Sequence, residues 1–101
     1  MEVKEIMTAL GVTNLSEEQI SKVLEICGIS PETAGKWVAD ETKLTPETLE
    51  QTMEIFGYRL ECGDTGYRFL FSRRGKEKQF YIHGSSLRYL LQAIDRWEQE
   101  D

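Results

Sequence analysis

The sequence has little of the material from which catalytic and metal sites are built. Its 101 residues include one histidine, His83, and two cysteines, Cys27 and Cys62. Two cysteines form neither a disulfide framework nor a zinc site, and they suit a reducing compartment, so we expect a cytoplasmic protein. The chain also lacks a phosphate-binding loop, a dinucleotide-binding glycine pattern, a zinc-protease motif and a calcium-binding loop. These absences predict a protein that is not an enzyme and that uses no metal or cofactor.

Long apolar runs are absent as well. No stretch approaches the roughly 20 apolar residues that a membrane span needs, so no membrane partner is expected. The first residues are charged and amphipathic, unlike the apolar core of a secretory signal. With 40% hydrophobic and 30% charged residues, the composition is typical of a folded domain. We expect one domain over 1–101, because its helical part (1–57) and its second part (58–101) are each small for independent folding.

Charge is unevenly distributed along the chain. The formal net charge is −6. Residues 1–57 contain eleven acidic residues against four lysines and no arginine, whereas residues 58–101 contain eight basic residues against seven acidic ones. Such an asymmetry constrains the partners of a protein rather than its fold. An acidic first part disfavours contact with phosphates, because a duplex-binding domain is usually basic on one face.

Apolar residues recur at helical spacing through the first part of the chain. The run over 3–10 is followed by a glycine, and a second helix begins at Ser16, where the serine and Gln19 satisfy each other's backbone amides in a capping box. A third helix begins at Ser30-Pro31 and a fourth at Thr45-Pro46. In both pairs a hydroxyl caps the helix and proline takes the first helical position, where its missing N–H costs nothing.

From residue 58 onward the apolar period changes to two. Tyr58, Leu60 and Cys62 alternate with polar residues, and two further alternating runs follow across turns at 63–66 and 73–76. This pattern predicts a three-stranded antiparallel meander whose apolar face needs a cover. A last helix, capped by Ser85 or Ser86, supplies that cover, and the expected fold class is α+β. The apolar side of this C-terminal helix consists of Leu87, Leu90, Leu91, Ile94 and Trp97.

Several features follow one another in a fixed order over residues 15–60. An apolar-rich helix runs into the turn Gly28-Ile29-Ser30, the next helix places Ala34 and Trp37 inward, and a polar loop leads into a proline-led helix. In this order of features the segment resembles the Cro and phage-repressor-like (Xre) family of helix-turn-helix proteins. The resemblance implies a helix-turn-helix-like bundle that binds duplex DNA as a transcriptional regulator, working as a homodimer. The DNA contacts that it implies are Ser30, Glu32, Thr33 and Lys36, with Arg73, Arg74, Lys76 and Lys78 added from the basic hairpin.

Two features of this segment depart from the family pattern. Leu24 stands where the family often has a small residue that lets the helices cross closely. The expected recognition helix offers Lys36 as its cation, while Glu32, Asp40 and Glu41 would face the phosphates. Base reading relies on Arg, Lys, Asn and Gln, and phosphate contacts supply most non-specific affinity. The composition of this helix therefore favours another function for the acidic half.

Our leading hypothesis is a non-enzymatic protein-interaction module. An acidic surface with phosphate-like spacing competes with nucleic acid for a basic groove, and it would inhibit a basic nucleic-acid-binding protein of the host by charge mimicry. In size and charge the chain resembles small phage or mobile-element proteins, including DNA-mimicking inhibitors such as anti-CRISPR proteins. The expected acidic face consists of Glu17, Glu18, Glu32, Asp40, Glu41, Glu47, Glu50 and Glu54.

The basic hairpin and the aromatic residues leave further interfaces open. The hairpin tip can follow a phosphate backbone, or it can dock on the acidic half of another copy and form a homodimer. A group of aromatic residues exposed together would mark a protein interface. The aromatic residues that cannot all belong to the core are Trp37, Tyr58, Tyr67, Tyr81, Tyr89 and Trp97.

Overall fold

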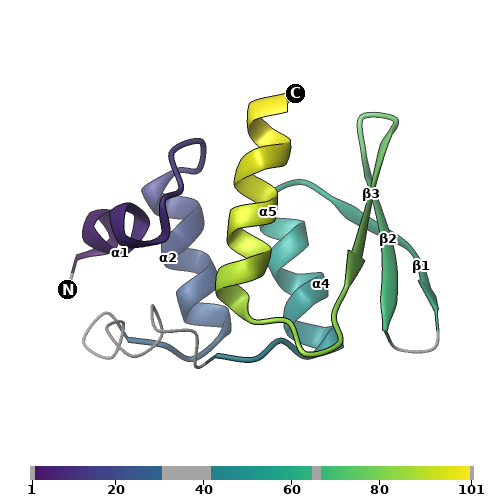
Figure 1. Ribbon diagram of the computed structural model, residues 1–101, viewed down its shortest axis with the longest axis horizontal. Coiled ribbons are helices and arrows are strands. Elements are labelled where there is room, and N and C mark those ends of the chain that lie inside the picture. The colour runs from purple at the N-terminus through teal and green to yellow at the C-terminus, as the bar shows by residue number, and fades with distance from the viewer. Residues whose placement is uncertain (1, 31–41, 65–66, 101) are drawn as a thin grey trace.

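The computed structural model describes residues 2–30, 42–64 and 67–100 (Figure 1). The predicted α+β class is confirmed, with helices at both ends of the chain and a three-stranded antiparallel sheet of order β1-β2-β3. The third helix predicted from Ser30-Pro31 lies outside the described residues, and so do Glu32, Lys36, Asp40 and Glu41. The elements are α1 (Val3–Leu10), α2 (Glu17–Ile26), α4 (Pro46–Ile55), β1 (Arg59–Asp64), β2 (Arg68–Arg73), β3 (Lys76–Tyr81) and α5 (Leu87–Glu100).

The caps predicted for α2 and α4 are present. The Gln19 amide donates to Ser16 Oγ at 3.1 Å, and the Ser16 amide donates to Gln19 Oε1 at 3.1 Å. Thr45 and Thr48 form the same reciprocal pair ahead of α4, with Pro46 at the start of the helix. Each box satisfies two backbone donors that the first turn of a helix leaves open, so the start of each helix is determined locally.

The sheet confirms the predicted meander but not its strict alternation. Phe69 and Phe71 of β2 are buried on one face, and Phe69 pairs with Phe80 of β3 across the ladder. In β1 the register shifts between Leu60 and Cys62, which is a β-bulge. The extra residue breaks the period of two, so Cys62 is exposed although Leu60 packs against the core.

The two-residue loop between β2 and β3 has the backbone conformation of a tight hairpin. Arg74 and Gly75 have φ angles of 53° and 78°. Positive φ at both central residues is typical of a type I′ turn, whose twist matches that of the flanking strands. The turn therefore fixes the register of β2 and β3.

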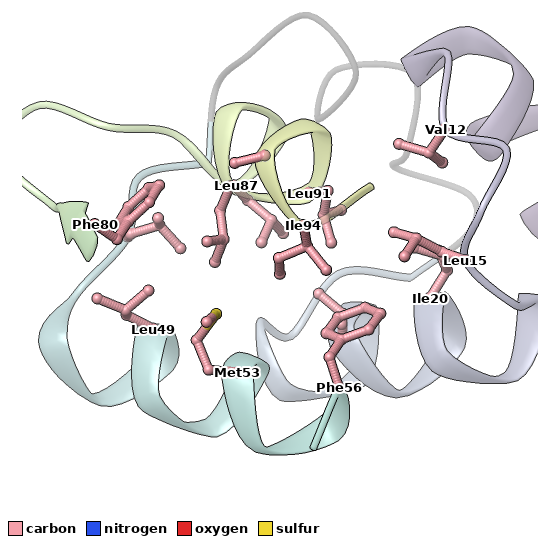
Figure 2. Packing of buried hydrophobic residues seen from close by; sticks show 14 of the residues in the cluster. Val12, Leu15, Ile20, Leu49, Met53, Phe56, Phe80, Leu87, Leu91 and Ile94 are labelled. Carbon is pink, nitrogen blue, oxygen red and sulfur yellow. The ribbon is translucent and has the colours of Figure 1, made fainter. Parts of the chain in front are cut away.

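Helix α5 joins the two parts of the chain in one hydrophobic cluster. Figure 2 shows Leu91 and Ile94 of α5 opposite Ile20 of α2 and Met53 of α4. All four side chains are fully buried. The predicted apolar side of α5 is confirmed, with Trp97 only partly buried at its end. None of the described helices is both long and apolar enough to cross a lipid bilayer.

One buried carboxylate in α5 was missed by the sequence analysis. Asp95 is 9% exposed, and its Oδ1 accepts the backbone amides of Thr13 at 2.9 Å and Asn14 at 2.7 Å. The Asn14 side chain returns a hydrogen bond to the Asp95 carbonyl at 3.3 Å. One turn earlier, Gln92 Nε2 donates to the Leu10 carbonyl at 2.9 Å. Polar groups of α5 therefore hold the connection between α1 and α2 in place.

Candidate functional site

Helix α4 presents a row of exposed glutamates. Glu47, Glu50 and Glu54 are all exposed, and their spacing places them within about 60° of one another around the helix axis. Helix α4 contains no lysine or arginine. None of the three carboxylates forms an ion pair with any residue in the described ranges.

The neighbouring helix α2 adds further acidic side chains. Glu17 and Glu18 are exposed, and Glu18 makes an exposed ion pair with Lys22 at 3.5 Å, a kind of contact that contributes little. Glu25 is also exposed and follows Glu18 by two helical turns. Glu25 is not among the residues expected from the sequence, although the same helical period points to it. Helices α2 and α4 lie side by side (Figure 2). We call the group Glu17, Glu18, Glu25, Glu47, Glu50 and Glu54 the acidic face.

The basic hairpin divides into buried and exposed cations. Arg73 Nη1 donates to the Phe56 carbonyl at 2.9 Å and pairs with Glu98, and its side chain is only 13% exposed. The guanidinium also lies over the ring of Tyr58. We had expected Arg73 to be available to nucleic acid, but its position makes it a structural contact between β2, α4 and α5.

Lys78 is held in a similar way at the far end of α5. Its Nζ lies 3.9 Å from Glu100 Oε2 and 5.8 Å from the centre of the Trp97 ring, and the side chain is 16% exposed. Arg74 and Lys76 are exposed at the hairpin tip, as expected. The hairpin therefore offers two exposed cations rather than the four that the sequence suggested.

A groove separates β3 from α5. Figure 1 shows this strand and this helix next to each other. The groove has a volume of about 550 Å³ and is lined from β3 by Gln79, Phe80 and Tyr81 and from α5 by Tyr89, Ala93 and Arg96, among others. Tyr81 is 58% exposed and Tyr89 is 53% exposed. Among the lining residues that the structure describes, none is a carboxylate.

The structure shows which of the aromatic residues are buried and which are exposed. Tyr58 is buried in the core, and Trp97 is half-buried against its ring at 6.0 Å. Tyr67 is exposed and meets His83, another residue of the groove, edge-on at 5.0 Å. Two of the three exposed tyrosines, Tyr81 and Tyr89, thus line the groove, and Tyr67 contacts a residue that also lines it. Trp37 lies outside the described residues.

The thiols and hydroxyls considered as reactive groups lie in the following environments. Burial raises the pKa of the Cys27 thiol, and Cys62 is exposed beside Gly63. Ser85 Oγ donates to the Tyr81 carbonyl at 2.8 Å, while Ser86 Oγ accepts the Tyr89 amide at 3.3 Å and so caps α5. Across residues 2–30, 42–64 and 67–100, no three His, Cys, Asp or Glu side chains are grouped to hold a metal ion.

Comparisons with known proteins add no relative. No family model matches the chain, and neither a curated protein nor a solved structure does. The resemblance to the Cro and Xre proteins therefore stays a prediction based on the sequence of about residues 15–60. The function has to be inferred from the surfaces described above.

Proposed function

We propose that this protein is a non-enzymatic interaction module that binds a basic surface on a nucleic-acid-handling protein and inhibits that protein by charge mimicry. The observation that supports this proposal is the row of Glu47, Glu50 and Glu54 on α4. The three carboxylates are exposed on one side of a helix that has no cation of its own. Because no cation on the helix neutralises these charges, their electrostatic field extends into the solvent. This field steers association and favours a basic partner.

The positions of two glutamates are unfavourable for helix stability, which supports a role in binding. Glu25 and Glu54 lie in the last turns of α2 and α4, where the helix dipole is negative. Neither has an ion pair within the part of the chain that the structure describes. By contrast, Glu98 and Glu100 in the last turn of α5 are paired with Arg73 and Lys78. Among the described residues, the glutamates in the last turns of α2 and α4 are thus unpaired, whereas those of α5 are paired.

The spacing of the α4 row suits the replacement of a nucleic-acid strand. Its members are separated along the axis by about 4.5 and 6 Å, from a rise of 1.5 Å per residue. Charges along one DNA strand recur about every 3.4 Å of helix axis, so the two spacings are of the same scale. Small size and net negative charge are also shared with phage inhibitors such as anti-CRISPR proteins, and we include a phage or mobile-element origin in the proposal.

The experiment compares wild-type protein with two charge-matched variants as bait in a nuclease-treated host lysate. One variant combines Glu47→Lys, Glu50→Lys and Glu54→Lys. The control combines Glu2→Lys, Glu5→Lys and Glu77→Lys, which makes the same change in net charge at exposed positions outside the acidic face. We expect wild type and control to retain a basic protein that the α4 variant loses, and we expect duplex DNA to displace it.

A second measurement separates this proposal from the DNA-binding alternative. Fluorescence anisotropy follows the pure protein against a labelled mixed-sequence duplex, from low to physiological salt. The proposal predicts no binding. Saturable binding that weakens steeply with salt would instead support a helix-turn-helix regulator. Equal capture of the basic protein by the α4 variant and the control would rule out the acidic face as the binding surface.

A further inference from the structure

An outer strand of the sheet, β3, has backbone groups that no other strand in the described ranges pairs. Strand β3 is an edge strand, because the sheet order is β1-β2-β3. Arg73 and Lys76 flank the two-residue loop and pair across it. In such a hairpin these two residues exchange both backbone hydrogen bonds, and bonded residues then alternate along the strand. The amides and carbonyls of Lys78 and Phe80 therefore point to β2, and those of Glu77, Gln79 and Tyr81 point away from it.

Two hydrogen bonds agree with this orientation. The Ile82 amide donates to the Tyr67 carbonyl at 2.8 Å, as the alternation requires for the next bonded residue of the ladder. The Tyr81 carbonyl accepts Ser85 Oγ at 2.8 Å, and Ser85 is a lining residue of the groove. The unpaired edge of β3 is therefore directed into the space between β3 and α5. By the same alternation the backbone groups of Gln79 make no ladder bond to β2, and within the described ranges no backbone bond from a turn or loop reaches them.

The opposite wall of the groove is one side of α5. Tyr89, Ala93, Arg96 and Trp97 follow one another at i, i+4, i+7 and i+8, so they share a face of the helix. The stretch from Tyr89 to Arg96 spans about 10 Å along the axis, which is the length of roughly three extended residues. Ala93 is the smallest residue of the four and is almost fully buried, whereas Tyr89 and Arg96 are exposed.

We propose that the groove binds an extended acidic segment of a partner protein, which adds to the sheet as a fourth strand alongside β3. Strand addition is favoured because the free amide and carbonyl of Gln79 can form hydrogen bonds with the backbone of an extended peptide. Acidic side chains are favoured because Arg96 is exposed and has no ion pair within the described ranges, and because none of the described residues that line the groove is a carboxylate. An apolar side chain of the same segment would contact the exposed ring of Tyr89.

Two other occupants fit the same groove less well. A second copy of this chain would offer β3 itself, whose sequence has two lysines and one glutamate, so its charge does not complement Arg96. A single-stranded nucleic acid would stack on the tyrosines, but it would leave the strand edge unpaired and would need a row of cations along its backbone. The free edge and the charge therefore favour an acidic peptide.

The test uses the full chain and a pool of labelled peptides of about eight residues, near the length of an ordinary strand. In the pool, glutamate alternates with valine, leucine, isoleucine or phenylalanine. A matched pool has lysine in place of glutamate. We expect saturable binding of the glutamate pool by fluorescence anisotropy, and slower hydrogen exchange of the Gln79 amide in the complex. Any binding of the lysine pool at the acidic face should leave the exchange of the Gln79 amide unchanged.

Two pairs of variants locate the site. Gln79→Pro removes the amide that points into the groove and spares the ladder to β2, while Gln79→Ala keeps that amide. Arg96→Glu reverses the charge of the wall, while Arg74→Glu makes the same change at the hairpin tip. Binding should weaken at least about tenfold in Gln79→Pro and Arg96→Glu, and stay within about twofold in the two controls.

Several results would overturn the proposal. These are no saturable binding of the glutamate pool, equal binding by Arg96→Glu and Arg74→Glu, or a Gln79 amide that exchanges at the same rate with and without peptide. Sedimentation velocity tests whether a second copy of the chain occupies the groove. If wild type is a dimer and Gln79→Pro is a monomer, the edge of β3 serves self-association. Binding of a labelled oligothymidylate in place of the peptides would assign the groove to nucleic acid. None of these outcomes depends on the acidic face of α2 and α4.

Discussion

The guanidinium of Arg73 lies 4.4 Å from the centre of the Tyr58 ring. This contact joins the last residue of β2 to the residue that immediately precedes β1. The same guanidinium donates to the carbonyl of Phe56 at the end of α4 and pairs with Glu98 of α5. A side chain from a basic hairpin thus becomes a junction of three elements, and it completes the C-terminus of α4 with a positive charge.

Replacement of Arg73 should therefore destabilise the fold. For Arg73→Ala we expect a loss of about 2–3 kcal/mol in the free energy of unfolding, because Glu98 and the Phe56 carbonyl lose a charged donor in a poorly exposed site. Arg73→Lys should recover only part of this loss, since an ammonium cannot serve the carbonyl, the carboxylate and the ring together. Urea unfolding followed by circular dichroism measures the free energy of unfolding of both variants. The control Arg74→Ala should stay within about 0.5 kcal/mol of wild type.

The carboxylate of Asp95 should be as important for the connection between α1 and α2 as Arg73 is for the junction of β2, α4 and α5. Asp95→Ala leaves the amides of Thr13 and Asn14 without their acceptor, and we expect a loss of about 2–4 kcal/mol. Asp95→Asn should cost less because its amide oxygen still accepts a hydrogen bond. Hydrogen exchange of the Thr13 and Asn14 amides should accelerate in Asp95→Ala. Gln99→Ala, an exposed change on the same helix, should leave both amides unaffected.

Removal of the Thr52 hydroxyl should leave the free energy of unfolding unchanged or increase it. Thr52 is fully buried in α4, and its Oγ1 has no hydrogen-bond partner within the described residues. Thr52→Val keeps the shape and removes the unsatisfied group, so we expect a gain of about 0–1 kcal/mol. Thr48→Val removes a member of the capping box from the same helix and should lose about 1 kcal/mol. An unfolding midpoint for Thr52→Val as low as that of Thr48→Val would contradict this account.

The two thiols should differ in reactivity. Burial raises the pKa of Cys27 above that of an ordinary thiol, so at pH 8 less of it is thiolate and its access to reagent is restricted. Cys62 is exposed. Titration with Ellman's reagent should show one fast and one slow phase. Cys62→Ser should abolish the fast phase, and the remaining phase should accelerate only at higher pH, because a raised pKa shifts thiolate formation upward.

The sequence by itself determined the local features of the fold. The capping residues Ser16 and Thr45, the period of apolar residues and the turn at Arg74-Gly75 act within a few residues of chain, so their structural effect could be predicted from spacing alone. The row of glutamates on α4 could be predicted for the same reason, since residues seven apart share a helix face. The fold class followed from the change of period near residue 58.

Only the tertiary structure decided which polar groups meet across the chain. Asp95 and Asn14 are 81 residues apart, and Arg73 and Glu98 are 25 residues apart, so no local rule indicated either contact. The bulge that exposes Cys62 depends on the pairing of β1 with β2. The groove likewise exists only because α5 packs beside an edge strand, which brings Gln79 and Arg96 to the same space. Packing between distant elements determines burial, and burial decides whether a charge serves the fold or remains available for a partner.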